Sequence, residues 1–119
     1  YNLWVICLDW QRGPNRGPHH ASPTMITLKE DNTIEYRFDY YMYGQFMKFI
    51  KRDAVRIFST QGNRYFNNVA FLNPDGSIVL VVANAETKTQ KISVKCGDKF
   101  FRAEIPQKTV ATFLIKGNR

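Results

Sequence analysis

The stretch VAFLNPDGSIVLVVAN, residues 69–84, decides the fold of this 119-residue chain. Val69 to Leu72 and Ile78 to Asn84 are apolar and β-branched, which is typical of buried strands. Between them, Asn73-Pro74-Asp75-Gly76 is typical of a tight turn, because proline presets φ at the second position and glycine tolerates a positive φ. The stretch therefore predicts an antiparallel β-hairpin.

Further strands are predicted on both sides of this hairpin. Apolar residues alternate at Ile92, Val94 and Cys96, then again at Phe101, Ala103 and Ile105 after a turn at Gly97-Asp98. The expected strands are Val55–Ser59, Val69–Leu72, Ile78–Asn84, Lys91–Cys96, Phe101–Ile105 and Val110–Ile115. Short strands separated by frequent turns indicate an antiparallel β-sandwich over residues 54–119.

Residues 1–53 predict a different architecture. Leu3 to Leu8 is continuously apolar, as in a strand of a parallel sheet that is buried on both faces. A loop rich in Gly and Pro, residues 9–20, follows it, and residues 23–38 predict two short extended pieces. Apolar residues then recur every three or four positions from Tyr40 to Ile50, which predicts a helix with Asp39 as its N-terminal cap.

Composition excludes some classes of function. The net charge is +7, with the basic excess in the second half, but the lysines are scattered along strands and turns rather than interleaved with aromatic residues. We therefore expect no nucleic-acid partner. No apolar run is long enough to span a membrane, and no signal peptide is recognisable. The chain begins at Tyr1 with strand-like sequence, so we expect further sequence upstream. Cys7 and Cys96 are expected to be buried core residues rather than a disulfide.

The residues that could carry chemistry are few. The carboxylates lie in turns, at the helix start or in the predicted sandwich, no Gly-x-Ser-x-Gly elbow is present, and Cys7 lies inside a strand. His19 and His20 are adjacent and cannot easily point at one metal, so neither a metal site nor a cofactor is expected. Trp4 and Trp10 are either core residues or platforms for the apolar face of a sugar ring, and position favours Trp10, at the strand's C-terminal end.

The order of motifs resembles the C-terminal quarter of the glucosylceramidase-like enzymes, glycoside hydrolase family 30. The resemblance rests on Trp4 with Leu8-Asp9, on Gly13-Pro14-Asn15 and Ser22-Pro23, and on YYMYGQFMKFI at residues 40–50 and AVRI at residues 54–57. The stretch quoted above completes it, so the resemblance covers nearly the whole chain.

The resemblance implies that residues 1–53 are the last strand, active-site loop and helix of a (β/α)₈ barrel, and that residues 54–119 are the sandwich beside it. Members are retaining β-glycosidases with two catalytic glutamates on earlier barrel strands. No glutamate here matches them, so no catalytic residue is expected in this chain. Trp4 matches the tryptophan that stacks on the sugar, with Trp10 nearby. Arg12 replaces a Gly of the usual pattern, and His19 and His20 stand near the place of a sugar-contacting Asn.

Two hypotheses follow. In the first, the intact parent hydrolyses a β-linked glucoside or glucan, and this chain supplies a wall of the site beside the upstream barrel but has no activity alone. The resemblance then implies a secreted, periplasmic or lysosomal-type compartment. In the second, the chain is a non-catalytic carbohydrate-binding or interaction β-sandwich.

Overall fold

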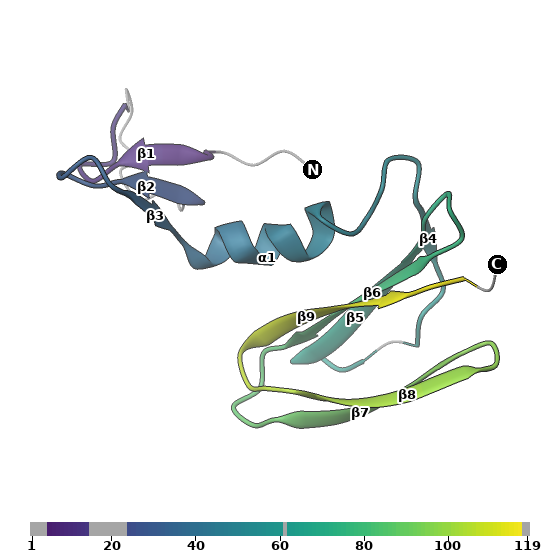
Figure 1. The fold of residues 1–119 in the computed structure, drawn as a ribbon. Helices are drawn as coiled ribbons and strands as arrows, with labels where there is room; N and C mark the ends of the chain where they lie inside the picture. The colour runs from purple at the N-terminus through teal and green to yellow at the C-terminus, as the bar shows by residue number, and fades with distance from the viewer. Residues whose placement is uncertain (1–4, 15–23, 61, 118–119) are drawn as a thin grey trace. The chain divides into compact units, whose positions relative to one another are not determined.

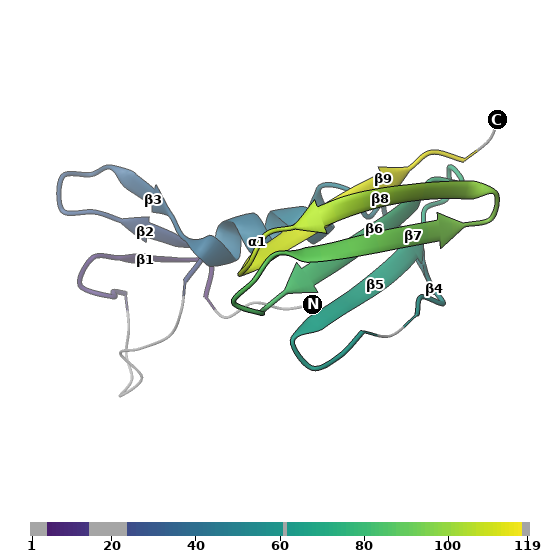
Figure 2. The ribbon, with the colours of Figure 1, turned by 90° about the horizontal axis from the view of Figure 1, so that it is seen from below.

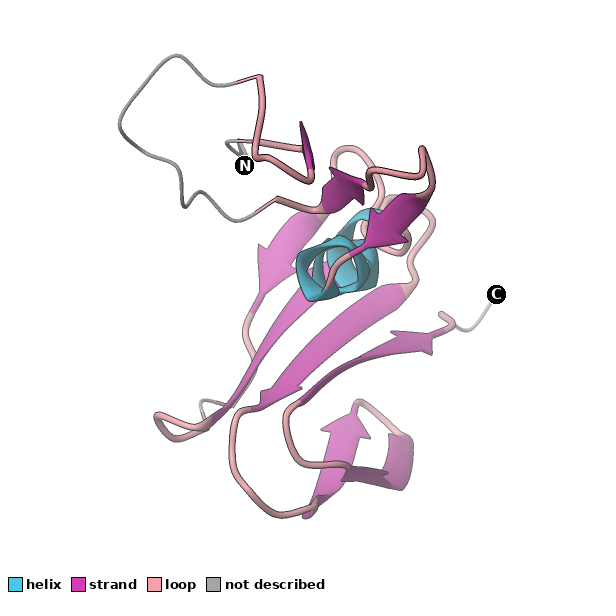
Figure 3. Ribbon diagram, turned by 90° about the vertical axis from the view of Figure 1, so that its left-hand side faces the viewer, coloured by secondary structure: helices cyan, strands magenta, loops and turns pink. Residues whose placement is uncertain are grey.

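The computed structural model describes residues 5–14, 24–60 and 62–117. Within them the chain is mostly β, with one helix (Figures 1 and 3). The fold consists of two compact units, Tyr1–Gly44 and Gln45–Arg119. The boundary between these units lies within the helix, between Gly44 and Gln45. The predicted domain boundary between residues 53 and 54 stays a prediction.

The first unit holds a small sheet. Its strands are β1 (Cys7–Asp9), β2 (Ile26–Leu28) and β3 (Ile34–Tyr36), in the order β1-β2-β3. β1 and β2 are parallel, whereas β2 and β3 form an antiparallel pair. The turn between β2 and β3 is closed by Asp31, whose Oδ1 accepts a hydrogen bond from the N–H of Thr33 at 2.9 Å.

The prediction of a long buried strand from Leu3 to Leu8 is wrong for the described residues. β1 has only three residues, and Leu8 alone is buried while Ile6 and Cys7 are exposed. Within the part of the chain that the structure describes, β1 pairs with β2 on one side, and this accounts for the exposed side chains. The expectation of a buried Cys7 is also wrong, since Cys7 is exposed.

The helix, α1 (Phe38–Met47), exists but is displaced from its predicted bounds of Tyr40 to Ile50. Asp39 lies inside the first turn of α1, so it is not the N-terminal cap that the sequence predicts. Its negative charge there interacts favourably with the positive end of the helix dipole. A final turn continues past Met47, because the N–H of Ile50 donates to the carbonyl of Phe46 at 2.9 Å. No residue of α1 is fully buried.

The second unit has two β layers, and it contains a strand at each of the six places predicted for residues 54–119 (Figure 2). One layer is a four-stranded antiparallel sheet of order β4-β5-β6-β9. The other is the two-stranded hairpin β7-β8. The strands are β4 (Val55–Ile57), β5 (Phe66–Leu72), β6 (Ile78–Asn84), β7 (Gln90–Cys96), β8 (Lys99–Ile105) and β9 (Thr109–Ile115).

The core lies between the two layers. Ala70, Leu80 and Val82 of the four-stranded sheet pack with Ile105 of β8, and Ile92 and Val94 of β7 pack against them. The predicted alternation is confirmed, because Ile92, Val94 and Cys96 are shielded while the residues between them are exposed. β6 lies between β5 and β9 in the four-stranded sheet, and its Val79 and Val81 are buried as well.

The hairpin that decides the fold has its predicted turn. The N–H of Asn73 donates to the carbonyl of Ser77 at 2.8 Å, and the N–H of Gly76 donates to the carbonyl of Asn73 at 2.9 Å. Gly76 has a φ of 77°, a conformation that glycine adopts without steric cost. β5 and β6 then pair along their whole length, from Leu72 opposite Ile78 to Phe66 opposite Asn84.

Candidate functional site

The loop that follows β1 begins with a tight turn organised by Asp9. The N–H of Gly13 donates to Asp9 Oδ1 at 2.6 Å, and the N–H of Asp9 donates to the carbonyl of Gly13 at 2.8 Å. A Cβ at position 13 would lie 3.0 Å from Asp9 Oδ2, so glycine allows this close approach. The far end of the loop is tied back by Thr24, whose hydroxyl donates to the carbonyl of Ile6 at 2.9 Å. The start of the loop is therefore fixed to β1, and its far end to Ile6, the residue before β1.

Arg12 occupies a left-handed conformation in this turn, with a φ of 67°. Its N–H donates to the carbonyl of Asp9 at 2.9 Å, which closes the turn. A non-glycine residue in this region costs about 1 kcal/mol or more. Glycine adopts this conformation without strain, which explains the Gly that the family pattern has at position 12. Arginine is accommodated there at a cost in backbone conformational energy.

Of the four predicted sugar-binding residues, only Trp10 lies within the described part of the chain. It follows β1 directly, at the C-terminal end of that strand, and its side chain is 51% exposed. An indole so exposed is open to a ligand, as a stacking platform requires. Trp4, His19 and His20 lie outside the described residues, so their roles stay predictions.

The aspartates with perturbed pKa values have partners that keep them ionised. The Lys51 ammonium donates to Asp75 Oδ2 at 2.5 Å and, with the Ser77 hydroxyl, holds the pKa of the Asp75 carboxyl well below its usual range. The Thr33 hydroxyl likewise lowers the pKa of Asp31. A general acid needs a raised pKa instead. These two carboxylates are therefore suited to closing turns, not to protonating a leaving group.

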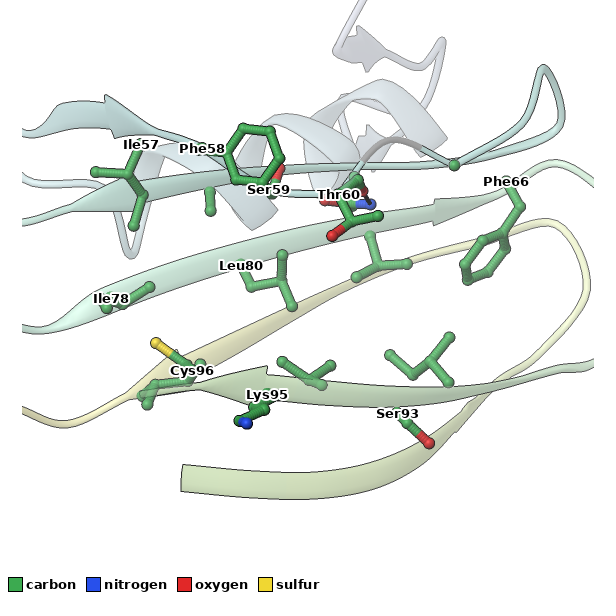
Figure 4. A pocket seen from close by; sticks show the side chains of 17 residues that line it. Ile57, Phe58, Ser59, Thr60, Phe66, Ile78, Leu80, Ser93, Lys95 and Cys96 are labelled. Carbon is green, nitrogen blue, oxygen red and sulfur yellow. Dashed lines mark hydrogen bonds between the residues drawn. The ribbon is translucent and has the colours of Figure 1, made fainter. Parts of the chain in front are cut away.

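An apolar groove of about 460 Å³ runs between the layers of the second unit (Figure 4). Its walls include Ile57 and Phe58 on one side and Val94 and Cys96 on the other, with Leu80 between them. None of the described residues along its walls carries a carboxylate, so this lining does not include the paired acid groups of a glycosidase centre. Among the described residues, moreover, no group of three or more His, Cys, Asp or Glu side chains could hold a metal ion.

A feature that the sequence reasoning missed is the outer face of the β7-β8 hairpin. The pairing register places Lys91 opposite Glu104, Ser93 opposite Arg102 and Lys95 opposite Phe100. All six side chains are exposed. We call this surface the basic face: Lys91, Ser93, Lys95, Phe100, Arg102 and Glu104. The signal that could have found it is the period of two in both strands, which gathers apparently scattered charges on one side.

The helix in the described part of the chain is too short to cross a bilayer, and no candidate membrane span was found there.

Comparison with known proteins places these features in a family. Residues 53–113 match the glycosyl hydrolase family 30 beta sandwich domain. The chain is similar to the lysosomal acid glucosylceramidase of Mus musculus, with 27% identity over 114 residues, which is 93% of this chain and 22% of the mouse protein.

Two solved structures share the fold over nearly the whole chain. SrfJ from Salmonella typhimurium superposes with a TM-score of 0.84 and 25% identity, over 95% of this chain and 25% of that one. The endo-β1,6-glucanase BT3312 superposes with a TM-score of 0.82 and 28% identity, over 93% of this chain and 26% of that one. This chain therefore spans about a quarter of the length of each relative.

Proposed function

This chain belongs to glycoside hydrolase family 30, and we propose that it is the C-terminal part of a retaining β-glycosidase that hydrolyses β-linked glucosides. The observation that carries the proposal is similarity over more than nine-tenths of the chain both to a glucosylceramidase and to an endo-β1,6-glucanase. Both names describe enzymes that act on a glucosyl residue, and they differ in what is attached to that residue. The proposal therefore specifies the bond and not the leaving group.

In this proposal the first unit supplies a wall of the substrate site. Trp4 stacks on the sugar ring, Trp10 extends the aromatic surface, and His19 and His20 are polar contacts from the same loop. The turn around Asp9 supports this role, because its hydrogen bonds fix the start of the loop relative to β1. The nucleophile and the acid/base are glutamates of the upstream barrel, which forms the rest of the site.

The sandwich has a structural role in the same proposal. Its groove is apolar, and the residues that the structure describes around it include no carboxylate, so the chain alone should not turn over an aryl β-glucoside. We also propose a secreted, periplasmic or lysosomal-type location for the parent, in keeping with the mouse relative described as lysosomal. Fractionation of cells that express the tagged parent tests this: recovery only in the cytosol would contradict it.

The test of the substrate wall uses the full-length parent. Trp4→Ala and Trp10→Ala should each weaken binding of a glucoside inhibitor, Trp4→Ala by about tenfold or more, which corresponds to about 1.4 kcal/mol. Tyr65→Ala is a matched control, because Tyr65 is an aromatic residue of similar exposure, 53%, in the second unit. Unchanged affinity in Trp4→Ala, or an equal loss in Tyr65→Ala, would contradict the assignment.

The second hypothesis, a non-catalytic carbohydrate-binding module, is distinguished by activity. If the parent is a glycosidase, replacing either upstream catalytic glutamate by glutamine should abolish release of the aryl group while the inhibitor still binds. A parent that binds glucosides but never hydrolyses them would favour the module.

A further inference from the structure

We propose that the basic face of the β7-β8 hairpin binds a chain-like acidic polysaccharide, one that carries carboxylates on successive sugars. The basic face lies within the second unit. The binding depends on the charges of this hairpin and not on hydrolytic activity.

The cations of the basic face follow the direction of the strands. Lys91 and Lys95 lie on the same side of β7, four residues and so about 13 Å apart along the strand. Arg102 of β8 stands opposite Ser93, between the two lysines. The three cations therefore form a staggered row along the hairpin. Such a row matches an extended polymer with repeated negative charges better than it matches a single small anion.

The side chains of the basic face are exposed. Ser93 and Lys95 are among them, although both also border the groove between the two layers (Figure 4). The Lys91 side chain is 84% exposed, and its ammonium lies 3.6 Å from Glu104. An ion pair so exposed contributes little stability, so Lys91 can exchange Glu104 for another carboxylate at small cost.

The basic face also presents an aromatic ring. Phe100 is 58% exposed and stands opposite Lys95. The guanidinium of Arg102 lies over its ring, 5.6 Å from the centroid. This contact orients Arg102, whose planar fork suits a carboxylate. The remaining ring surface offers an apolar platform for the C–H face of a sugar. An acidic sugar has a carboxylate that pairs with a cation and a C–H face that packs on an aromatic ring, so this face matches both groups.

An anionic membrane fits this face less well. Stable binding to lipid headgroups uses larger basic clusters or several inserted apolar side chains. The basic face has one large apolar side chain, Phe100, and it includes the anionic Glu104. We therefore favour the polysaccharide, and vesicles enter the test as an alternative.

The experiment measures binding of the 119-residue chain to polygalacturonate at physiological salt by isothermal titration. Lys95→Gln combined with Arg102→Gln should weaken binding by about tenfold or more. Glu104→Gln should strengthen it, which keeps the test informative if the double variant folds poorly. Arg56→Gln is the matched control, since Arg56 is an exposed cation on β4 of the other layer, and it should bind as the parent sequence does.

Four outcomes would overturn the proposal. These are no binding, equal binding to an uncharged glucan, an equal loss in Arg56→Gln, and tighter binding to phosphatidylserine vesicles or duplex DNA than to polygalacturonate. Each is independent of the glycosidase assays on the parent, so failure here leaves the proposed hydrolytic function standing, and the reverse also holds.

Discussion

The side-chain amide of Asn73 holds the backbone of Lys51: the N–H of Lys51 donates to Asn73 Oδ1 at 2.9 Å. The same amide donates through Nδ2 to the carbonyl of Phe49 at 3.0 Å and to the Ser77 hydroxyl at 2.9 Å. Asn73 is only 2% exposed. A single buried side chain in the β5-β6 turn thus ties that turn to the segment that follows α1.

Replacing Asn73 by alanine should lower the free energy of unfolding by about 2 to 3 kcal/mol, because buried donors and acceptors lose their partners. Urea denaturation followed by circular dichroism measures this. Asn67→Ala is the control, since Asn67 is exposed and its side-chain Oδ1 accepts a hydrogen bond from the N–H of the next residue, Asn68. A loss of similar size in both variants would show that the clamp is unimportant.

The Lys51–Asp75 pair should make stability depend on acid pH. The pKa of Asp75 is lowered by folding, from 3.8 in the unfolded chain. Its contribution is therefore present above pH 3.8 and is lost as the pH falls toward the lower folded pKa. Asp75→Asn should lower the urea midpoint at pH 6 and approach the parent sequence near pH 2. A difference between the two that grows as the pH falls would contradict this sign.

Ile105 tests the core between the layers. It is 1% exposed and packs against Leu80 and Val82. Ile105→Ala should cost about 2 to 5 kcal/mol of unfolding free energy, because it loses burial and leaves a cavity. Leu114→Ala removes a side chain that is 49% exposed and should cost about 1 kcal/mol or less. Equal costs at the two positions would argue against the assigned core.

Replacing two glycines by alanine should change the stability of the protein in opposite directions. Gly76 has a φ of 77°, so Gly76→Ala should destabilise by about 1 kcal/mol through backbone strain. Gly44 lies inside α1, where Gly44→Ala should stabilise by about 0.5 to 1 kcal/mol. A Cβ would meet no atom within 4 Å at either position. Thermal melts of both variants separate backbone effects from packing, and shifts of the same sign would refute the explanation.

Much of the second unit could be predicted from local sequence. The β5-β6 turn follows from Pro74 and Gly76, and the strands follow from alternating or continuous apolar runs. These signals act over a few residues, so their outcome depends little on the rest of the chain. The helix was placed less well, because the apolar spacing that indicated Tyr40 to Ile50 does not specify where the first hydrogen-bonded turn forms.

The N-terminal strand shows a different limit. The apolar run from Leu3 to Leu8 predicts burial on both faces, but among the residues that the structure describes β1 is short, pairs with β2 alone and is preceded by the exposed Ile6. Burial depends on which elements pack against a strand, and the strand's own residues do not encode that. The family resemblance, by contrast, needed only the order of motifs and is confirmed by the match over residues 53–113.

The sequence by itself determined the turns, the strands of the sandwich and the family. The tertiary structure decided that β9 pairs with β6 while β7 and β8 form a separate layer, that Asn73 bonds a segment 22 residues away, and that Lys91, Lys95 and Arg102 share one face. The physical reason is range. Turn and strand preferences arise between neighbouring residues, whereas strand pairing, buried polar contacts and surface charge clusters join residues that only the folded chain brings together.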